Sequence, residues 1–201
     1  NSSAASDVYK RQVGIPPEKI LMITFTKAAA QEMSVKFKKK FGEPNGITFS
    51  TIHALCLKIL MTYGGLSAEN IIKTSDQWKF LLETARKCQS VCDPAKAAGN
   101  FQMLYSAAMN NRMSPSEVNP KDIKGISRKD FLFMSDEYRR MKERTGYIDF
   151  DDMLVKAYEL MTGNPQVLRQ LRERWDYIQV DEYQDVNYLQ RDLVYLSLIH
   201  I

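Results

Sequence analysis

The sequence predicts an α/β protein that is built on a parallel sheet and interrupted by an all-helical block. Three observations carry this prediction. Two short apolar runs within 20–65 are each followed by a helical pattern, the stretch 66–145 shows only helical periodicity, and an apolar run returns at 177–181. Strands that alternate with helices favour a parallel sheet. The long helical stretch is therefore predicted to be an insertion between two strands.

The first strand–helix unit follows Pro16 and Pro17. The run 20–25 is almost continuously apolar, which is typical of a strand buried on both faces of a parallel sheet. Apolar residues then recur at helical spacing up to Gly42, which ends the pattern. They are Ala30, Met33, Phe37 and Phe41. The second unit repeats the plan, with a brief strand at 47–50 and a helix closed by Gly64 and Gly65.

The helical stretch opens with Thr74 three residues before Gln77, a pattern that predicts a capping box. Amphipathic helices follow on both sides of a loop at 114–120. After Gly146, helices are predicted at 149–161 and 166–175, and a last strand at 177–181. The predicted order is βαβα, a helical block and then β.

Composition fits a globular protein, because 44% of the 201 residues are hydrophobic and 26% are charged. The net charge of +4 permits a nucleic-acid partner without requiring one. The three cysteines and two histidines are not spaced as a metal site, which favours reduced thiols in a cytosolic protein. No apolar run approaches the length of a membrane span and no signal-peptide pattern opens the chain, so we expect a cytoplasmic protein without membrane partners.

The two ends of the sequence differ in character from the rest. Residues 1–12 lack an initiator Met and any hydrophobic periodicity, and the periodic spacing before 194–201 gives way to a run without a turn or cap. We expect both ends to be foreign to the gene, and native flanking codons in the source DNA would contradict this.

The most specific chemical signal is Val-Asp-Glu-Tyr-Gln-Asp at 180–185, directly after the last predicted strand. Ligands of open α/β sheets collect at the carboxyl ends of the strands. Two adjacent carboxylates at this place can divide the work of a nucleotide hydrolase. Asp181 is expected to hold Mg²⁺ through water, and Glu182 to orient and deprotonate the attacking water. Taken alone, an Asp-Glu pair after a strand is more often a solvated turn.

Tyr-Ile-Gln-Val-Asp-Glu-Tyr-Gln-Asp-Val-Asn at 177–187, the block that contains these carboxylates, resembles motif II of the UvrD/PcrA/Rep helicases of superfamily 1. Thr-Phe-Thr-Lys-Ala-Ala-Ala-Gln-Glu-Met at 24–33 is similar to motif Ia, and Ser-Thr-Ile-His-Ala-Leu-Cys at 50–56 to motif Ib. Tyr-Ile-Asp-Phe-Asp-Asp-Met-Leu at 147–154 resembles the segment that precedes motif II. The blocks stand in the family's order.

The resemblance implies roles for individual residues. Glu182 is implied as the general base, Asp181 as the metal ligand, and Gln184 and Asp185 as supporting residues of motif II. The residues implied to bind DNA lie in motifs Ia and Ib. They are Thr24, Phe25, Thr26, Lys27, Thr51 and His53.

Physical chemistry supports a DNA role at these strand ends, because an aromatic ring can stack on an unpaired base and a hydroxyl can bind a phosphate. For Phe25, burial in the core is the alternative. The sequence departs from the family at Lys27, where relatives commonly have Asn, and at Ile52 and Ala54, which replace Phe and Ser. Lys27 suits a contact with a backbone phosphate rather than with a specific base, and the hydroxyl that is missing at Ala54 predicts a weaker motif Ib contact.

Two further groups of charged side chains have simpler interpretations. Asp149, Asp151 and Asp152 could form another carboxylate site, but their position favours the start of a helix with Asp149 as N-cap. Packing or positioning of the DNA path is expected of them rather than catalysis. The lysines at 36–40 are expected to be a solvated helix face.

The resemblance implies a RecA-like P-loop NTPase motor with an inserted all-helical subdomain. Residues 13–65 and 146–193 are expected to belong to motor domain 1A, and 66–145 to the insertion, subdomain 1B. The implied cofactors are ATP and Mg²⁺, and the implied partners are single-stranded DNA and duplex junctions. The implied activity is ATP-driven 3′→5′ translocation on single-stranded DNA with duplex unwinding.

The 201 residues contain no Gly-x-x-x-x-Gly-Lys-[Ser/Thr] loop, whose amides and lysine bind the phosphates of ATP. In the family this loop precedes motif Ia, and a second motor domain follows motif II. We therefore expect the 201 residues alone to be inactive. Two alternatives remain open at this point: the motor of an AddA-like recombination helicase–nuclease, and a DNA-binding or interaction module without ATPase activity.

Overall fold

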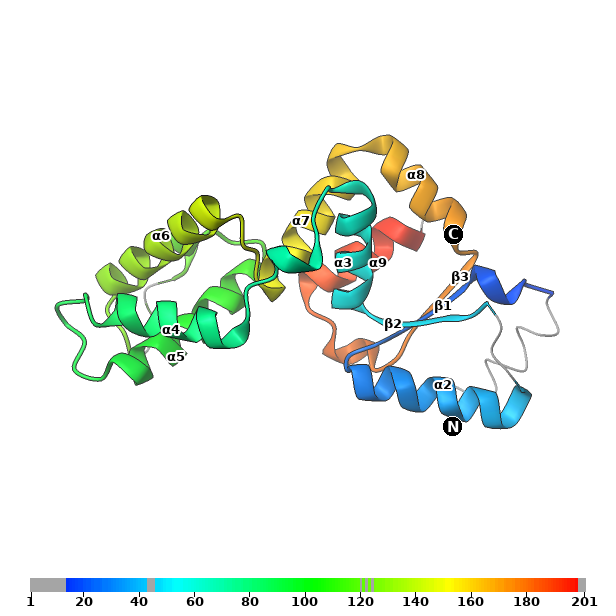
Figure 1. Ribbon diagram of the computed structural model, residues 1–201, viewed down its shortest axis with the longest axis horizontal. Helices are drawn as coiled ribbons and strands as arrows, with labels where there is room; N and C mark the ends of the chain where they lie inside the picture. Colours follow the sequence, from blue (N-terminus) through cyan, green and yellow to red (C-terminus); the bar gives the residue numbers. More distant parts are fainter. Residues whose placement is uncertain (1–13, 43–45, 120, 122, 124, 199–201) are drawn as a thin grey trace.

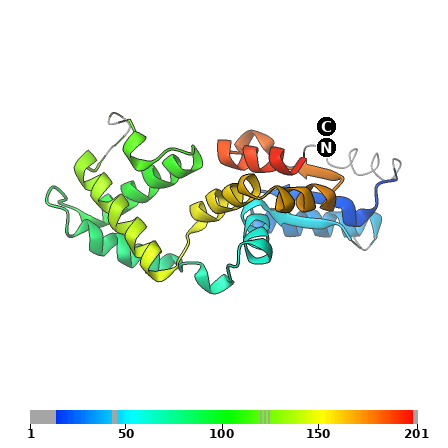
Figure 2. The same ribbon diagram turned by 90° about the horizontal axis from the view of Figure 1, so that it is seen from above.

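The chain forms two bodies that lie side by side along the long axis of the molecule (Figure 1, Figure 2). The structure is a computed structural model that describes residues 14–42, 46–119, 121, 123 and 125–198, except for the side chains of Phe41, Asp185 and Leu198. One body is a sheet with helices on both faces, and the other consists of helices. We call the second body, helices α4, α5 and α6, the helical block.

The sheet contains the strands β1 (Ile20–Thr24), β2 (Thr48–Thr51) and β3 (Tyr177–Val180). The helices of this body are α2 (Lys27–Phe41), α3 (Ile52–Tyr63), α7 (Phe150–Gly163), α8 (Pro165–Arg174) and α9 (Tyr188–Leu198). The helical block contains α4 (Thr74–Ala85), α5 (Pro94–Asn110) and α6 (Arg128–Thr145). Short 3₁₀ turns are η1 (Pro17–Lys19), η2 (Ala68–Asn70), η3 (Pro115–Glu117) and η4 (Tyr183–Asp185).

The described strands form a parallel sheet in the order β2-β1-β3. β1 lies in the middle and all of its residues are buried, as its continuous apolar sequence predicts. Helix α2 covers one face of the sheet, and α3 and α9 lie on the other (Figure 1). The predicted α/β class with a parallel sheet is confirmed.

Each body has its own hydrophobic cluster. Side chains of β1, α3, α7, α8 and α9 form the first, and side chains of the helical block form the second. In the second cluster, Phe101 is packed against the rings of Tyr105, Phe131 and Tyr138 at centroid distances of 5.3, 5.7 and 6.2 Å. This aromatic packing adds to the stability that the other buried side chains of the cluster give the block, because aromatic pairs contribute free energy beyond plain area burial.

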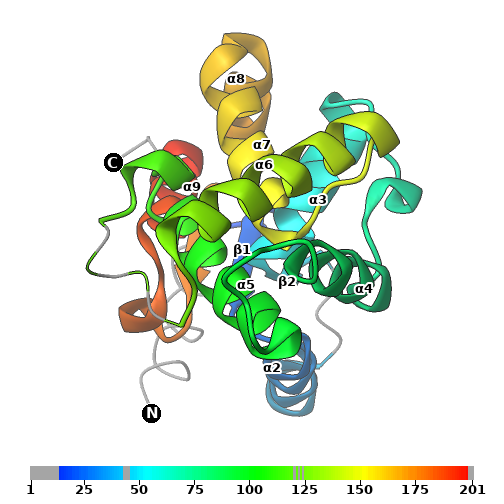
Figure 3. The same ribbon diagram turned by 90° about the vertical axis from the view of Figure 1, so that its left-hand side faces the viewer.

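The two linkers between the bodies are hydrogen-bonded to each other. Ile148 N donates to Asn70 O at 2.8 Å, and Ile72 N donates to Ile148 O at 2.9 Å. Ile71 and Ile148 thereby form an isolated parallel bridge. Figure 3 shows the helical block in front of the sheet, with α7 behind α6. The bodies are thus joined by backbone bonds between the linkers, and Asn70 Nδ2 also donates to Gly146 O at 3.2 Å.

The capping box at Thr74 is wrong, because α4 begins at Thr74 and Lys73 is the N-cap residue. Residues 1–12 and 199–201 lie outside the described residues, while α9 continues to Leu198 and buries Val194. The foreign origin of the ends stays a prediction. None of the helices in the described part of the chain has the length and apolar character needed to cross a membrane.

Candidate functional site

The carboxyl ends of the three described strands meet at one edge of the sheet. Thr24, the last residue of β1, is in register with Thr51, the last residue of β2. On the other side, Ile23 is in register with Val180, and Asp181 N donates to Ile23 O at 2.8 Å. Segments that are far apart in the sequence therefore begin their turns side by side, as expected of parallel strands.

In the turn between β1 and α2, the side chain of Thr24 is buried and that of the next residue, Phe25, is exposed. Thr24 is only 2% exposed, and its hydroxyl donates to Thr26 O at 3.0 Å. The hydroxyl of Thr26 caps α2 by accepting from Ala29 N at 3.0 Å. Phe25 is 39% exposed between them, and Lys27 is exposed at the start of α2. Thr24 thus supports the turn, and the ring of Phe25 is available to a ligand.

The turn between β2 and α3 presents a hydroxyl and an imidazole. Thr51 caps α3 by accepting from Ala54 N at 3.1 Å. His53 lies half-buried in the first turn of α3, where burial lowers the pKa of its imidazole below the ordinary value. The neutral form of His53 is therefore favoured at neutral pH, and one ring nitrogen can donate while the other accepts.

A groove of about 520 Å³ runs between α2 and the β2–α3 segment. Its wall includes Lys27, Gln31, Ser34, Phe49 and Thr51. An ammonium, an amide, hydroxyls and an aromatic ring thus face one open space. Such a mixture suits a ligand with both phosphates and flat rings.

The segment after β3 turns sharply at Glu182. This residue has φ 50° and ψ 45°, a left-handed conformation that is uncommon for any residue except glycine and is often found at functional sites. Its side chain is exposed, and Gln184 Nε2 donates to Glu182 Oε2. Within the described part of the chain, the carboxylate of Asp181 has no hydrogen-bond or ion-pair partner. The side chain of Asp185 lies outside the described residues.

The arrangement can be compared with known proteins. The family model of the UvrD/REP helicase N-terminal domain matches residues 8–198. The chain belongs to this family. The predicted resemblance is confirmed, and the parallel sheet with its surrounding helices is part of a RecA-like helicase domain.

Several curated relatives of this UvrD/REP helicase domain are named as DNA helicases. The putative ATP-dependent DNA helicase YjcD of Bacillus subtilis is 31% identical over 186 residues, which cover 89% of the chain and 24% of that protein. A probable DNA helicase II homolog of Mycoplasma capricolum is 30% identical over 195 residues, 90% of the chain and 26% of that protein. The ATP-dependent DNA helicase PcrA of Staphylococcus aureus is 29% identical over 187 residues, which cover 90% of the chain and 25% of that protein. The chain spans about a quarter of the length of these relatives.

Sequence reasoning missed Phe150, an exposed aromatic residue beside the site. Phe150 is 55% exposed, and its ring lies 5.7 Å from that of His53 at 72°. Little in the sequence indicates a role for Phe150, because it stands between aspartates in a segment whose pattern is already explained as the start of a helix. Only the fold brings the start of α7 to the start of α3.

The acidic segment around Phe150 is structural. Asp149 is 2% exposed and caps α7 in a reciprocal box with Asp152, so the predicted N-cap is confirmed. Lys142 Nζ lies 3.0 Å from Asp149 Oδ2 and 2.7 Å from Asp152 Oδ2. Burial by itself lowers the pKa of Lys142, but the two carboxylates more than offset burial and hold that pKa above its ordinary value. Among the described residues, no group of three or more His, Cys, Asp or Glu side chains is placed to hold a metal ion.

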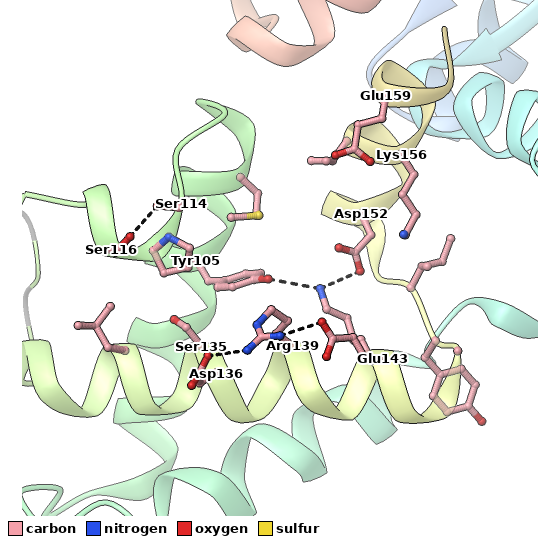
Figure 4. A pocket seen from close by; sticks show the side chains of 18 of the residues that line it. Tyr105, Ser114, Ser116, Ser135, Asp136, Arg139, Glu143, Asp152, Lys156 and Glu159 are labelled. Carbon is pink, nitrogen blue, oxygen red and sulfur yellow. Dashed lines mark hydrogen bonds and ion pairs between the residues drawn. The ribbon is translucent and has the colours of Figure 1, made fainter. Parts of the chain in front are cut away.

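A cavity of about 990 Å³ lies next to this ion-pair group, between α6 and α7 (Figure 4). Lys142 Nζ lies 3.4 Å from Tyr105 Oη of α5 and 2.7 Å from Asp152 Oδ2 of α7. Tyr138 Oη donates to Asp149 Oδ2 at 2.8 Å. The buried charges therefore join α6 to α7, and α7 carries Phe150 to the site.

Proposed function

We propose that the chain is part of an ATP-dependent DNA helicase that moves 3′→5′ along single-stranded DNA and separates duplexes. Residues 13–65 and 146–193 belong to motor domain 1A in this proposal, and 66–145 form subdomain 1B. The observation that carries it is the meeting of motifs Ia, Ib and II at one edge of the sheet. The residues at the ends of β1 and β2 that would contact DNA therefore lie at the same edge of the sheet as the carboxylates after β3.

In the proposed DNA site, Phe25 and Phe150 offer exposed rings to unpaired bases, and the neutral His53 lies beside Phe150. Base stacking on an aromatic residue contributes about 1–3 kcal/mol per base. Thr26, Lys27 and Thr51 face the phosphates. Thr24 acts indirectly by holding the turn that exposes Phe25.

The residues after β3 fit a nucleotide with Mg²⁺. The half-exposed carboxylate of Asp181 has no partner among the described residues and is an oxygen ligand of the kind that Mg²⁺ prefers, directly or through water. Mg²⁺ bound with ATP would neutralise the charge that develops on the phosphates. Glu182 orients and deprotonates the attacking water in this proposal. The amide of Gln184 supports it by holding one of its carboxylate oxygens.

The phosphate loop and the second motor domain belong to other parts of the full-length protein in this proposal, and the 201 residues alone are expected to be inactive. Cytoplasmic location and a role in DNA repair complete the proposal. Two observations support the proposal. The chain belongs to the family, and the relatives that match 87–90% of the chain are named as DNA helicases.

Strand displacement by the full-length protein tests the function. A short labelled duplex with a 3′ single-stranded tail should be separated when ATP and Mg²⁺ are present, and the same duplex with a 5′ tail should stay intact. Separation with the 5′ tail only would contradict the polarity. Degraded strands would favour the helicase–nuclease alternative, and DNA binding without ATP hydrolysis would favour the module that lacks ATPase activity.

A further inference from the structure

The helical block contacts the segment after motif II through one asparagine. Asn110, at the end of α5, accepts through Oδ1 from Asn187 Nδ2 at 3.0 Å. Asn187 follows η4 closely and caps α9, because Gln190 N donates to Asn187 Oδ1 at 2.8 Å. The two asparagines are 77 residues apart in the sequence. The bond therefore joins the helical block to the start of α9.

The other side of Asn110 is held by α7. Asn110 Nδ2 donates to Asp151 Oδ1 at 3.1 Å, and Ser106 Oγ donates to the same oxygen at 2.8 Å. Asp151 is half-buried, and a half-buried carboxylate keeps its position best when its hydrogen bonds are satisfied. Asn110 is thus fixed by α7 on one side and holds Asn187 on the other.

Arg112 makes a second contact of the same kind. It has φ 57°, which turns the chain back after α5. Its guanidinium lies 3.3 Å from Asp192 Oδ2 of α9 and 4.3 Å from the ring centre of Tyr158 of α7. The end of α5 is therefore attached to both α7 and α9. These contacts are made by side chains, so they can open while the backbone bonds of the linkers remain.

The segment between Asp181 and Asn187 is consequently held at both ends. At one end Asp181 N is bound to Ile23 O at 2.8 Å, and at the other Asn187 is bound to Asn110 at 3.0 Å. Glu182 lies inside this segment in its left-handed conformation. Such a conformation persists only when its surroundings fix it. Release of the Asn187 end would let the Glu182 carboxylate move relative to the nucleotide.

We propose that Asn110 is a positioning residue for motif II, so that full-rate ATP hydrolysis requires the helical block to be attached through the Asn110–Asn187 bond. The inference rests on the proposed function and adds a control of the same site by another part of the chain. Asn110 touches neither nucleotide nor DNA in this account. It acts through Asn187 on the placement of Glu182, and misplacement of a reacting group by about 1 Å costs about 100-fold in rate.

The test compares Asn110→Ala with Asn111→Ala in the full-length protein. Asn111 is the matched control, because it is exposed and, among the described residues, its side-chain amide donates only to Ala107 O of its own helix at 2.7 Å. With saturating single-stranded DNA, Asn110→Ala should lower kcat for ATP by about 10- to 100-fold and leave KM for ATP within about twofold. Asn111→Ala should match the wild type in both.

A second variant approaches the bond from the other side. Asn187→Asp keeps the oxygen that caps α9 and removes the amide that donates to Asn110. It should lower kcat as Asn110→Ala does, and the double variant should be no slower than either single variant, because both remove one bond. If Asn110→Ala does not fold, Asn187→Asp alone still tests whether the Asn110–Asn187 bond is needed for full-rate ATP hydrolysis.

Three results would overturn the inference: a kcat of Asn110→Ala equal to that of Asn111→Ala, a lower Tm with unchanged kcat in the folded protein, or losses that multiply in the double variant. If the wild type hydrolyses no ATP with single-stranded DNA, the proposed function itself fails. If the wild type is active and the variant matches it, only the positioning role of Asn110 fails.

Discussion

At the scale of single residues, neighbouring side chains at the sheet edge have opposite environments. Thr24, the last residue of β1, is buried, whereas Phe25, the next residue, is 39% exposed. The strand ends between the two residues, so Phe25 already belongs to the turn that leads to α2. The hydroxyl of Thr26 then fixes the start of α2. A ring that is held by a capped turn and exposed to solvent has little conformational freedom to lose when it stacks on a base.

Phe25→Ala should therefore weaken binding of single-stranded DNA by the full-length protein, by about 1–3 kcal/mol. Its stability should change little, because the ring is 39% exposed. Val35→Ala is the matched control, since Val35 lies on the same helix that follows Phe25 and is 64% exposed. Fluorescence anisotropy and Tm measured on each variant separate the two effects.

A Tm loss for Phe25→Ala with unchanged DNA affinity would instead place Phe25 in the core. Replacement of Lys36 should neither lower the Tm nor remove a stacking contact with DNA. Lys36 is exposed and paired with Glu32 at 2.7 Å, so its replacement should at most flatten the salt dependence of binding.

At the scale of elements, the buried ion pairs of Lys142 join α6 to α7 and so place the start of α7 at the site. Tyr138 and Gln77 extend the group, because Gln77 Nε2 donates to Tyr138 Oη at 2.7 Å. Burial and then Asp149 raise the pKa of Tyr138 above its ordinary value, which keeps its hydroxyl protonated as a donor. The group is satisfied only when all its members are present.

Lys142→Met should destabilise the protein by about 3–5 kcal/mol, because two buried carboxylates lose their counter-ion. Burial also raises the pKa of Asp152, so its proton is bound more tightly in the folded than in the unfolded state. Stability of the variant should accordingly recover as the pH falls from neutral toward the ordinary carboxyl value of 3.8.

Urea unfolding at several pH values measures this, with Lys156→Met as the control on α7, where the lysine is exposed. A deficit for Lys142→Met that does not shrink at lower pH would mean that lost packing, and not buried charge, is responsible.

Patterns of neighbouring residues in the sequence predicted the helices and strands, but they did not predict which side chains of different elements touch. The apolar run of β1, the N-cap at Asp149 and the carboxylates after β3 were predicted because each depends on neighbours in the sequence. The box at Thr74 failed because α4 already begins at Thr74, so the N-cap position falls on Lys73, whose side chain makes no cap hydrogen bond. The partners Lys142 of Asp149 and Asn110 of Asn187 come from different elements, and only the packing of the helices brings them together. The position of Phe150 beside His53 has the same origin.

At the scale of the whole molecule, two hydrophobic clusters are joined by hydrogen-bonded linkers and side-chain contacts. Each cluster contains one buried cysteine. Cys56 lies in the first cluster, where burial raises the pKa of its thiol to about 12. Cys88 lies in the second, and burial, followed by the nearby Asp130, raises its pKa to about 11. Cys92 is exposed.

Thiol labelling should therefore distinguish the two bodies. At pH 8 a thiol-specific reagent should label Cys92 in the folded protein, while Cys56 and Cys88 react only after unfolding, because the thiolate is the reactive form. If the bodies unfold independently, Cys56 and Cys88 become reactive at different urea concentrations. Mass spectrometry of labelled peptides gives both midpoints, and coincident midpoints would show that the two bodies unfold as one cooperative unit and contradict their independent unfolding.

The central claim is that the carboxyl edge of this sheet hydrolyses ATP in the full-length protein when DNA is bound. Its most direct test is ATP hydrolysis with saturating single-stranded DNA by the wild type and by Glu182→Gln, with Glu83→Gln as the control at an exposed site on α4. The account predicts a loss of about 10²–10⁴ in kcat for Glu182→Gln with nucleotide binding retained, because only the general base is removed. Hydrolysis by Glu182→Gln within a few-fold of the wild type would contradict it.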